Sequence, residues 1–134
     1  MKITFKPQTE WLPPQDFPDL SKYDEIAIDL ETKDPNLNER MGSGSVVGVG
    51  DVVGISLATC DWCAYYPIAH EGGGNMDRKM VLKWFQDQLN TPATKIFHNA
   101  MYDVCWIRAL GLRISGKIVD TMIAASLVDE NRFR

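Results

Sequence analysis

Glu25-Ile-Ala-Ile-Asp-Leu-Glu31 is the stretch from which the fold can be predicted. Its apolar residues recur at every second position, which is the spacing of a β-strand buried on one face. The other face then carries Asp29 and Glu31 side by side. A pair of carboxylates at a strand end can simply face water, so this pair alone leaves a functional site and a solvated strand end open. The buried face is formed by Ile26, Ile28 and Leu30.

The segments on either side of this strand are predicted to lack regular structure. Residues 1–19 contain four prolines, which remove backbone donors that a helix or central strand needs, and we expect an extended lead-in there. Residues 32–50 are rich in Asp, Asn, Pro, Gly and Ser and predict a long loop. The glycines at 42–50 are followed by no Gly-Lys-Ser/Thr, so a flexible loop near a cleft is expected rather than a phosphate cradle.

A hairpin and a helix are predicted next. Residues 52–59 and 64–68 have the composition of strands and are joined by a tight turn at Cys60–Cys63. After three glycines, Asn75 is a candidate N-cap for a helix that runs to about Leu89. This helix should pack on the sheet through an apolar stripe of Met76, Met80, Val81, Trp84, Phe85 and Leu89.

Two further strand-to-helix units complete the pattern. Residues 95–98 predict a strand, with Asn99 as the N-cap of a helix that ends at Gly111. A short strand at residues 118–119 precedes a helix at 122–128, which Asp120 or Thr121 can cap. Strands that alternate with helices in this way predict an α/β fold in which helices flank a mixed sheet.

Composition sets limits on function. The chain has 134 residues, 45% of them hydrophobic, which suits one folded domain. Its net charge of −4 argues against broad binding to duplex nucleic acid, whereas a nuclease that acts at a strand end needs a compact anionic metal site. The three cysteines are an odd number and predict no disulfide framework, which indicates a reducing compartment. Residues 42–58 are too short and too interrupted to span a membrane.

Asp103 points most strongly to a functional site. It is the only charged residue in the apolar stretch Ala100–Ile107, and an unpaired buried carboxylate is costly, so a positive group should lie beside it. In the first turn of a helix, the exposed N–H groups and the helix dipole favour the ionised form that a metal ion needs. A structural salt bridge to Arg108 or Arg113 is the alternative explanation.

Carboxylates on a strand and on a nearby helix terminus suit Mg²⁺ or Mn²⁺ better than Zn²⁺, because hard cations prefer oxygen ligands and retained waters. Two such ions roughly 3.5 to 4 Å apart can activate water and stabilise the leaving oxygen in phosphodiester hydrolysis. The sequence therefore indicates a nuclease.

A family resemblance supports the same chemistry. Asp29-Leu-Glu31-Thr32 resembles the first motif of the DEDD exonuclease superfamily, and Phe97-His-Asn-Ala-Met-Tyr-Asp103 resembles the second, in the expected order. Further stretches resemble the exonuclease domain of phage-type family A DNA polymerases, namely residues 29–37, 52–58 and 120–132. The resemblance covers most of residues 20–134 and implies a ribonuclease H-like mixed β-sheet flanked by helices.

The resemblance also implies roles for particular residues. Asp29 would bridge two divalent cations, Mg²⁺ or Mn²⁺. Glu31 would hold the first cation and its attacking water, and Asp103 would hold the second, largely through water. The cleft for the 3′-terminal nucleotides would be lined by Thr32, Asn99 and Tyr102.

The family has a third motif that this sequence lacks, a Tyr or His followed four residues later by a metal-binding Asp. The resemblance therefore implies a 3′-to-5′ proofreading exonuclease domain, residues 20–134, that is truncated at its C-terminal end and has weak or no activity alone. Its partners would be the single-stranded 3′ end of DNA and a polymerase domain in the same or a companion chain. It would work without a membrane, in the cytoplasm of the cell or of a phage-infected host.

Two alternatives stay open. One is a non-catalytic nucleic-acid-binding or structural domain with a decayed nuclease site, although a decayed site has no physical reason to keep three mutually repelling carboxylates. The other is a related 3′-to-5′ exoribonuclease, because metal-assisted attack on phosphorus does not depend on the 2′-hydroxyl. The polymerase-like flanks favour DNA.

Several other residues receive plainer interpretations. Asp120 is predicted to be a helix cap rather than a fourth ligand. Cys60-Asp-Trp-Cys63 has no second CxxC or His pair and is predicted to hold structural thiols. His70 is expected to be a solvated loop residue, and His98 either touches substrate or simply ends a strand.

Overall fold

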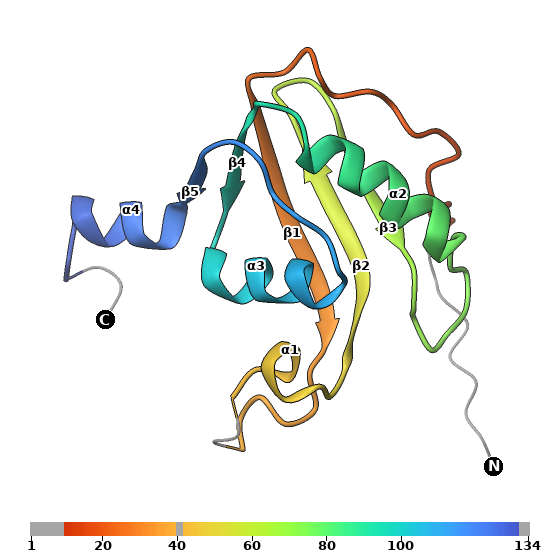
Figure 1. The fold of residues 1–134 in the computed structure, drawn as a ribbon, viewed down its shortest axis with the longest axis horizontal. Helices are drawn as coiled ribbons and strands as arrows, with labels where there is room; N and C mark the ends of the chain where they lie inside the picture. The colour runs from red at the N-terminus through yellow and green to blue at the C-terminus, as the bar shows by residue number, and fades with distance from the viewer. Residues whose placement is uncertain (1–9, 40–41, 132–134) are drawn as a thin grey trace.

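The computed structural model describes residues 10–39 and 42–131. In this part of the chain five strands form one mixed sheet in the order β3-β2-β1-β4-β5 (Figure 1). Strand β2 is antiparallel to both β1 and β3, whereas β1, β4 and β5 run parallel. The strands are β1 Glu25–Lys33, β2 Asp51–Ala58, β3 Cys63–Pro67, β4 Thr94–Phe97 and β5 Ile118–Asp120.

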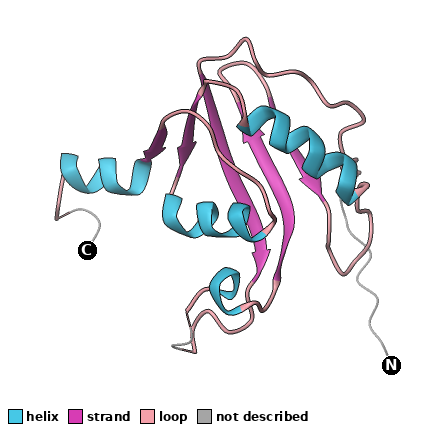
Figure 2. Ribbon diagram, viewed as in Figure 1, coloured by secondary structure: helices cyan, strands magenta, loops and turns pink. Residues whose placement is uncertain are grey.

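The described residues also form four helices, which are α1 Gly44–Val47, α2 Arg78–Leu89, α3 Ala100–Ala109 and α4 Thr121–Val128. Helices α2 and α3 lie over the same face of the sheet, and α4 lies beyond the β5 edge (Figure 2). The strand order, the mixed pairing and the flanking helices confirm the predicted α/β, ribonuclease H-like fold. None of the described helices is both long enough and apolar enough to cross a membrane.

The core lies between the sheet and α2, as the period of two in β1 predicts. Ile26, Ile28 and Leu30 are buried, while Asp29 and Glu31 on the opposite face are exposed. On α2 the buried residues are Val81, Trp84, Phe85, Gln88 and Leu89.

The predicted lead-in, residues 1–19, has no helix or strand from residue 10 onward, and residues 1–9 lie outside the described part. Three hydrogen bonds hold its end to the domain. The Trp84 indole donates to the Pro18 carbonyl at 2.8 Å, and the Tyr66 hydroxyl donates to the Asp16 carbonyl at 3.1 Å. The amide of Leu20 donates to the Gln88 side chain at 2.8 Å. Residues 16–20 therefore pack as part of the domain.

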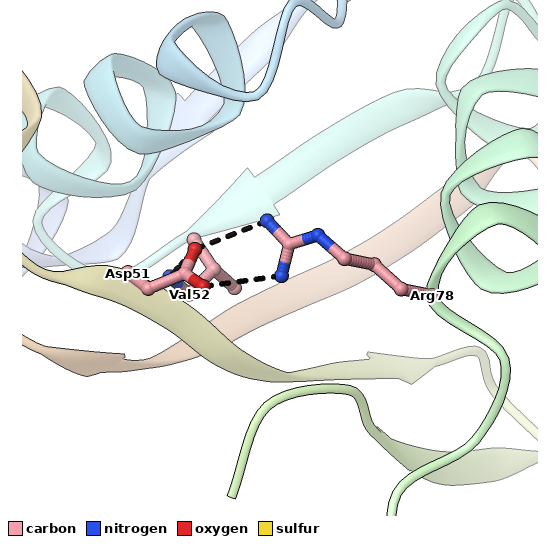
Figure 3. A network of polar contacts seen from close by, with 3 residues as sticks. All are labelled: Asp51, Val52 and Arg78. Carbon is pink, nitrogen blue, oxygen red and sulfur yellow. Dashed lines mark hydrogen bonds and ion pairs between the residues drawn. The ribbon is translucent and has the colours of Figure 1, made fainter.

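An ion pair joins the start of α2 to the start of β2 (Figure 3). The Arg78 guanidinium donates to both carboxylate oxygens of Asp51, at 3.0 and 3.2 Å, and Asp51 also accepts from the amide of Val52. Both side chains are more than a third exposed. Their contribution to stability is therefore small.

Two local predictions were wrong. Asp77, and not Asn75, is the N-cap of α2, since its side chain accepts from the amide of Met80 at 2.9 Å. Helix α2 consequently begins later, and Met80 is 57% exposed instead of buried in the apolar stripe. The loop predicted for residues 32–50 contains the short helix α1, because Ser43 caps its first turn and Gly48 ends it in a left-handed conformation.

Candidate active site

Strand β1 places Asp29 and Glu31 on the face of the sheet opposite α2. Asp29 pairs with Ser56 on β2, and Glu31 pairs with Gly54. Immediately after Glu31 the register shifts, and Thr32 begins a new register with β2. Such irregularities bend a strand and re-aim its side chains, and they are frequent next to active sites. Glu31 thus stands directly before the register shift, and Asp29 lies two residues earlier on the same face.

Asp103 reaches the same region from the first turn of α3. Its side chain is buried, with 4% of its surface exposed, and its Oδ2 atom has no hydrogen-bond partner among the residues that the structure describes. Burial raises the pKa of Asp103 to about 7, together with the negative charges of Asp29 and, to a smaller extent, Glu31, while the backbone amide of Leu30 acts in the opposite direction. Burial is thus the main cause of the shift, and the negative charges of Asp29 and Glu31 add to it.

The arginine alternative for Asp103 is wrong. Among the described residues the ion pairs are Lys33 with Glu71 and Arg78 with Asp51, and neither involves Asp103. The expectation that the residues around Asp103 are buried on all sides was also too broad, because Met101 is 79% exposed. Asp103 is thus a buried acid with no basic partner in the part of the chain that the structure describes.

The carboxylates have the properties that a divalent cation would satisfy. Among the described residues, no three His, Cys, Asp or Glu side chains are grouped so that they could hold a metal ion. Asp103 nevertheless has a buried oxygen with no partner among the described residues, and burial and neighbouring negative charges oppose its ionisation. A bound cation would stabilise its ionised form. The donor set, which consists of carboxylate oxygens, fits Mg²⁺ or Mn²⁺.

Asn99, at the start of α3, adopts a left-handed conformation with φ 63° and ψ 59°. Asn99 is the N-cap residue of α3, as predicted, although its side chain makes no capping hydrogen bond. Instead, the Asp120 carboxylate accepts from the amides of Asn99 and Ala100, at 3.0 and 2.9 Å. A strained backbone at a strand-to-helix junction is typical of functional sites, and the Asn99 side chain is exposed there.

Asp120 caps two helices at once. Besides the two amides of the α3 start, it accepts from the amide of Met122 in α4 at 2.9 Å, which is the predicted N-cap role. Burial alone would raise the pKa of Asp120, but the backbone N–H bonds, led by that of Ala100, lower it below the ordinary value. Its carboxylate oxygens are therefore engaged with backbone amides.

Thr32 and Tyr102 are brought together, as their predicted common role requires. The Thr32 hydroxyl lies 2.9 Å from the Tyr102 hydroxyl, which donates to Asp34 at 2.9 Å. Asp34 also accepts from the amide of Gly44 in α1. Sequence reasoning missed Asp34, although an Asp directly after a strand, ahead of a glycine-rich loop, is a common hydrogen-bonding residue.

A second group of polar residues, which sequence reasoning also missed, lies on β3 and in the following loop. Tyr65 hydrogen-bonds through its hydroxyl to Nε2 of His70, so the expectation that His70 is merely solvated was wrong. Burial, and next the charge of Glu31, raise the pKa of Tyr65, which places this phenol near Glu31. A groove of about 840 Å³ runs over this face and is lined by Asp29, Ser56, Tyr65 and His98, among others.

The remaining sequence features keep plain roles. Cys60 and Cys63 are exposed thiols at the β2–β3 turn, and Cys105 is a free thiol on α3. His98 is exposed, and its Nδ1 lies 3.0 Å from the Thr121 hydroxyl.

Comparisons with known proteins relate the chain to DNA polymerases. No family model matches it. It is 34% identical over 90 residues to a DNA-directed DNA polymerase of Pseudomonas phage M6, and 31% identical over 84 residues to DNA polymerase I of Chloroflexus aurantiacus. These matches cover 65% and 61% of this chain but only 13% and 9% of the two polymerases.

Solved structures with the same fold include NrnC of Brucella melitensis, with a TM-score of 0.56 and 21% identity, and the EXO domain of Nibbler from Aedes aegypti, with 0.58 and 17%. Each match covers 87% of this chain and about half of the other chain (50% and 51%). A structure of Brucella melitensis NrnC with bound Mg²⁺ gives a TM-score of 0.55 at 18% identity, over 92% of this chain and 53% of that one.

The polymerase matches confirm the resemblance seen in the motifs around Asp29 and Asp103. The chain shares the ribonuclease H-like fold of these solved structures, and over about three fifths of its length it is similar in sequence to a segment of two DNA polymerases.

Proposed function

We propose that this chain is a 3′-to-5′ exonuclease domain of a DNA polymerase, which removes nucleotides from single-stranded 3′ ends by hydrolysis. The observation that supports this most is Asp103, a buried acid without a basic partner in the described part of the chain, whose pKa is raised first by burial and then by the charges of Asp29 and Glu31. Sequence relationship to two DNA polymerases supports the same activity. An acid in this environment is expected where a cation belongs.

Asp29, Glu31 and Asp103 are the residues that would hold two Mg²⁺ or Mn²⁺ ions. When bound, such cations stabilise charge on the phosphate and lower the pKa of attacking water. The exposed Asp29 would bridge the two positions, with Glu31 at the first and Asp103 at the second. The structure of NrnC with bound Mg²⁺ is a solved example of a divalent cation in this fold.

Thr32, Asn99 and Tyr102 are the proposed contacts to the 3′-terminal nucleotides. The hydroxyls of Thr32 and Tyr102 form one hydrogen-bonded group with Asp34. The side chain of Asn99 is exposed, and its left-handed backbone donates a hydrogen bond from its N–H to the Asp120 carboxylate. These side chains are donors and acceptors suited to sugar and phosphate oxygens.

The proposed partners are the single-stranded 3′ end of DNA and a polymerase domain, and the proposed compartment is the cytoplasm. An exoribonuclease would use the same carboxylates, but the relatives over this stretch are DNA polymerases. The bounds of the domain at residues 20–134 stay a prediction.

The test begins with the 134-residue chain and a single-stranded DNA oligonucleotide labelled at its 5′ end. We expect the chain to bind Mn²⁺, as measured by calorimetry. We also expect it to shorten the oligonucleotide slowly and stepwise from the 3′ end in Mg²⁺ or Mn²⁺. Asp29→Ala should abolish both. Asp87→Ala removes an equal charge from the exposed face of α2 and should leave both unchanged.

The proposal fails if the wild type binds no Mn²⁺, or if Asp29→Ala binds and cuts as well as the wild type. Parallel reactions on an RNA oligonucleotide of the same sequence decide between the two nucleic acids, because a preference for RNA would favour the exoribonuclease.

A further inference from the structure

The hydroxyl of Tyr65 lies on the same face of the sheet as Asp29 and Glu31. Asp29, Ser56 and Tyr65 are paired across the three strands β1, β2 and β3, and residues paired in this way share a face. The next row contains Glu31 and Gly54. A Cβ added to Gly54 would overlap the Tyr65 phenol, so the Tyr65 ring extends across β2 toward Glu31.

Glycine at position 54 makes this arrangement possible. Any side chain there would occupy the space that the Tyr65 ring fills, on the row that also carries Glu31. The charge of Glu31 is the principal charge that Tyr65 senses. The phenol of Tyr65 therefore lies between the edge strand and the carboxylates without covering them, since Asp29 and Glu31 are exposed.

His70 fixes the position of the Tyr65 hydroxyl. Its Nε2 atom shares a hydrogen bond with that hydroxyl, and the rings stand edge to face with centroids 5.9 Å apart. The His70 backbone is held in turn by Asn75, which accepts from its amide at 2.7 Å and donates to its carbonyl at 2.9 Å. Asn75, which was predicted to be a helix cap, thus stabilises the loop that carries His70.

The Tyr65 side chain also faces open space. It lines the same groove as Asp29 and Ser56, and Trp11 packs against it there with ring centroids 5.9 Å apart. A ligand in this groove that reached the carboxylates would pass the Tyr65 hydroxyl. A hydroxyl that is oriented by a histidine and faces both a groove and an acidic site is built to contact an anion held there.

We propose that Tyr65 contacts the terminal phosphate of the substrate and that His70 is its positioning residue. Nε2–H of His70 donates to the Tyr65 oxygen, which leaves the phenol proton free to donate to a non-bridging phosphate oxygen. This inference rests on the proposed nuclease function, because the carboxylates alone would repel a phosphate. Gly54 and Asn75 serve the same purpose, since one makes room for the phenol and the other fixes the histidine loop.

The experiment measures binding of thymidine 5′-monophosphate and of thymidine to the 134-residue chain in Mg²⁺, by chemical-shift titration. Tyr65→Phe removes only the hydroxyl and should weaken binding of the monophosphate about tenfold or more, since hydrogen bonds to charged groups are the strong ones. Binding of thymidine should change less than twofold. Tyr66→Phe is the matched control, because the Tyr66 hydroxyl donates to the Asp16 carbonyl on the other face, and its affinities should equal those of the wild type.

Three more variants separate positioning from folding. Gly54→Ala keeps the hydroxyl but displaces it, and should reproduce the loss of Tyr65→Phe. His70→Gln keeps a donor and should retain more affinity for the monophosphate than His70→Leu does.

The inference is overturned if Tyr65→Phe binds the monophosphate within twofold of the wild type, or if Tyr66→Phe loses as much affinity as Tyr65→Phe. It is also overturned if the wild type binds Mn²⁺ but not the monophosphate, and in that case the carboxylate site survives. Absence of Mn²⁺ binding would instead remove the proposed function.

Discussion

Asp103→Asn should stabilise the metal-free protein, and by an amount that grows with pH. The substitution keeps the shape of the buried side chain and removes its ability to ionise. In the fold the pKa of Asp103 is about 7, against an ordinary value of 3.8. Because the folded value is the higher one, the native state holds a proton that the unfolded chain releases between these two pH values, and stability is lost as pH rises through that window.

The magnitude follows from the same two pKa values. Each tenfold change in proton affinity corresponds to about 1.4 kcal/mol, so at pH 8 the wild type should be less stable than Asp103→Asn by about 4 kcal/mol. At pH 5, only the lower part of the range between the two pKa values has been crossed. The difference in stability between the two proteins should then be below about 2 kcal/mol. The carboxyl is almost fully buried, so screening by solvent reduces this difference little.

Urea unfolding in EDTA at pH 5 and pH 8 measures the difference. Asp87→Asn, on the exposed face of α2, is the control and should show no such growth. Saturating Mg²⁺ at pH 8 should then raise the stability of the wild type and not that of Asp103→Asn, because a ligand that binds only the native state stabilises it. A difference that is the same at both pH values, or an equal effect of Mg²⁺ on both proteins, would refute the reasoning.

Two other pairs of substitutions test local features of the structure. Asn99 has a left-handed backbone, so Asn99→Ala should lower the free energy of unfolding by about 1 kcal/mol. Asn99→Gly should lower it by less, and urea titrations measure both values. A larger loss for the glycine variant would contradict the left-handed conformation. Phe85 is fully buried and Met80 is 57% exposed, so Phe85→Ala should cost about 3–5 kcal/mol and Met80→Ala less than about 0.5 kcal/mol. Calorimetry checks the second pair, and comparable losses would mean that the face of α2 has been misassigned.

The strands were predictable because their signal is local. In β1 the alternation of aliphatic and polar residues determines which face each side chain occupies, and the structure confirms that Ile28 is buried while Asp29 and Glu31 are exposed. The β2–β3 hairpin is also local, since its turn lies between two apolar runs. Whether the three carboxylates act as predicted is a separate matter, and their roles stay predictions.

The caps were harder to predict because several residues near a helix start have the right chemistry. Asn75 and Asp77 both precede α2, and the structure uses Asp77 as the cap and Asn75 to hold His70. At α3 the cap comes from Asp120, which is distant in sequence and lies next to Asn99 only because β4 and β5 pair. A cap that comes from another strand cannot be predicted from the residues next to the helix in the sequence.

Residues that meet across strands were missed for the same reason. Nothing in the order of residues says that Tyr65 will lie over Gly54, because that contact depends on the register between β2 and β3. A glycine inside a strand pattern is the one available signal, since it often marks a place where another group approaches closely. Asp34 was missed because its partner Tyr102 lies on a helix 68 positions later in the chain.

The burial of Asp103 also bears on the alternative of a decayed nuclease site. If the site had no cation to bind, replacing Asp103 by a neutral residue of similar size would remove both its desolvation cost and its repulsion with Asp29 and Glu31. The fold would gain stability and lose nothing. In a binding module that merely inherited the fold, a neutral residue at this position would therefore be more stable than the carboxylate. A nuclease needs the carboxylate, in its charged form, when a cation is present. The retention of Asp103 beside two other acids thus favours the catalytic interpretation over the structural one.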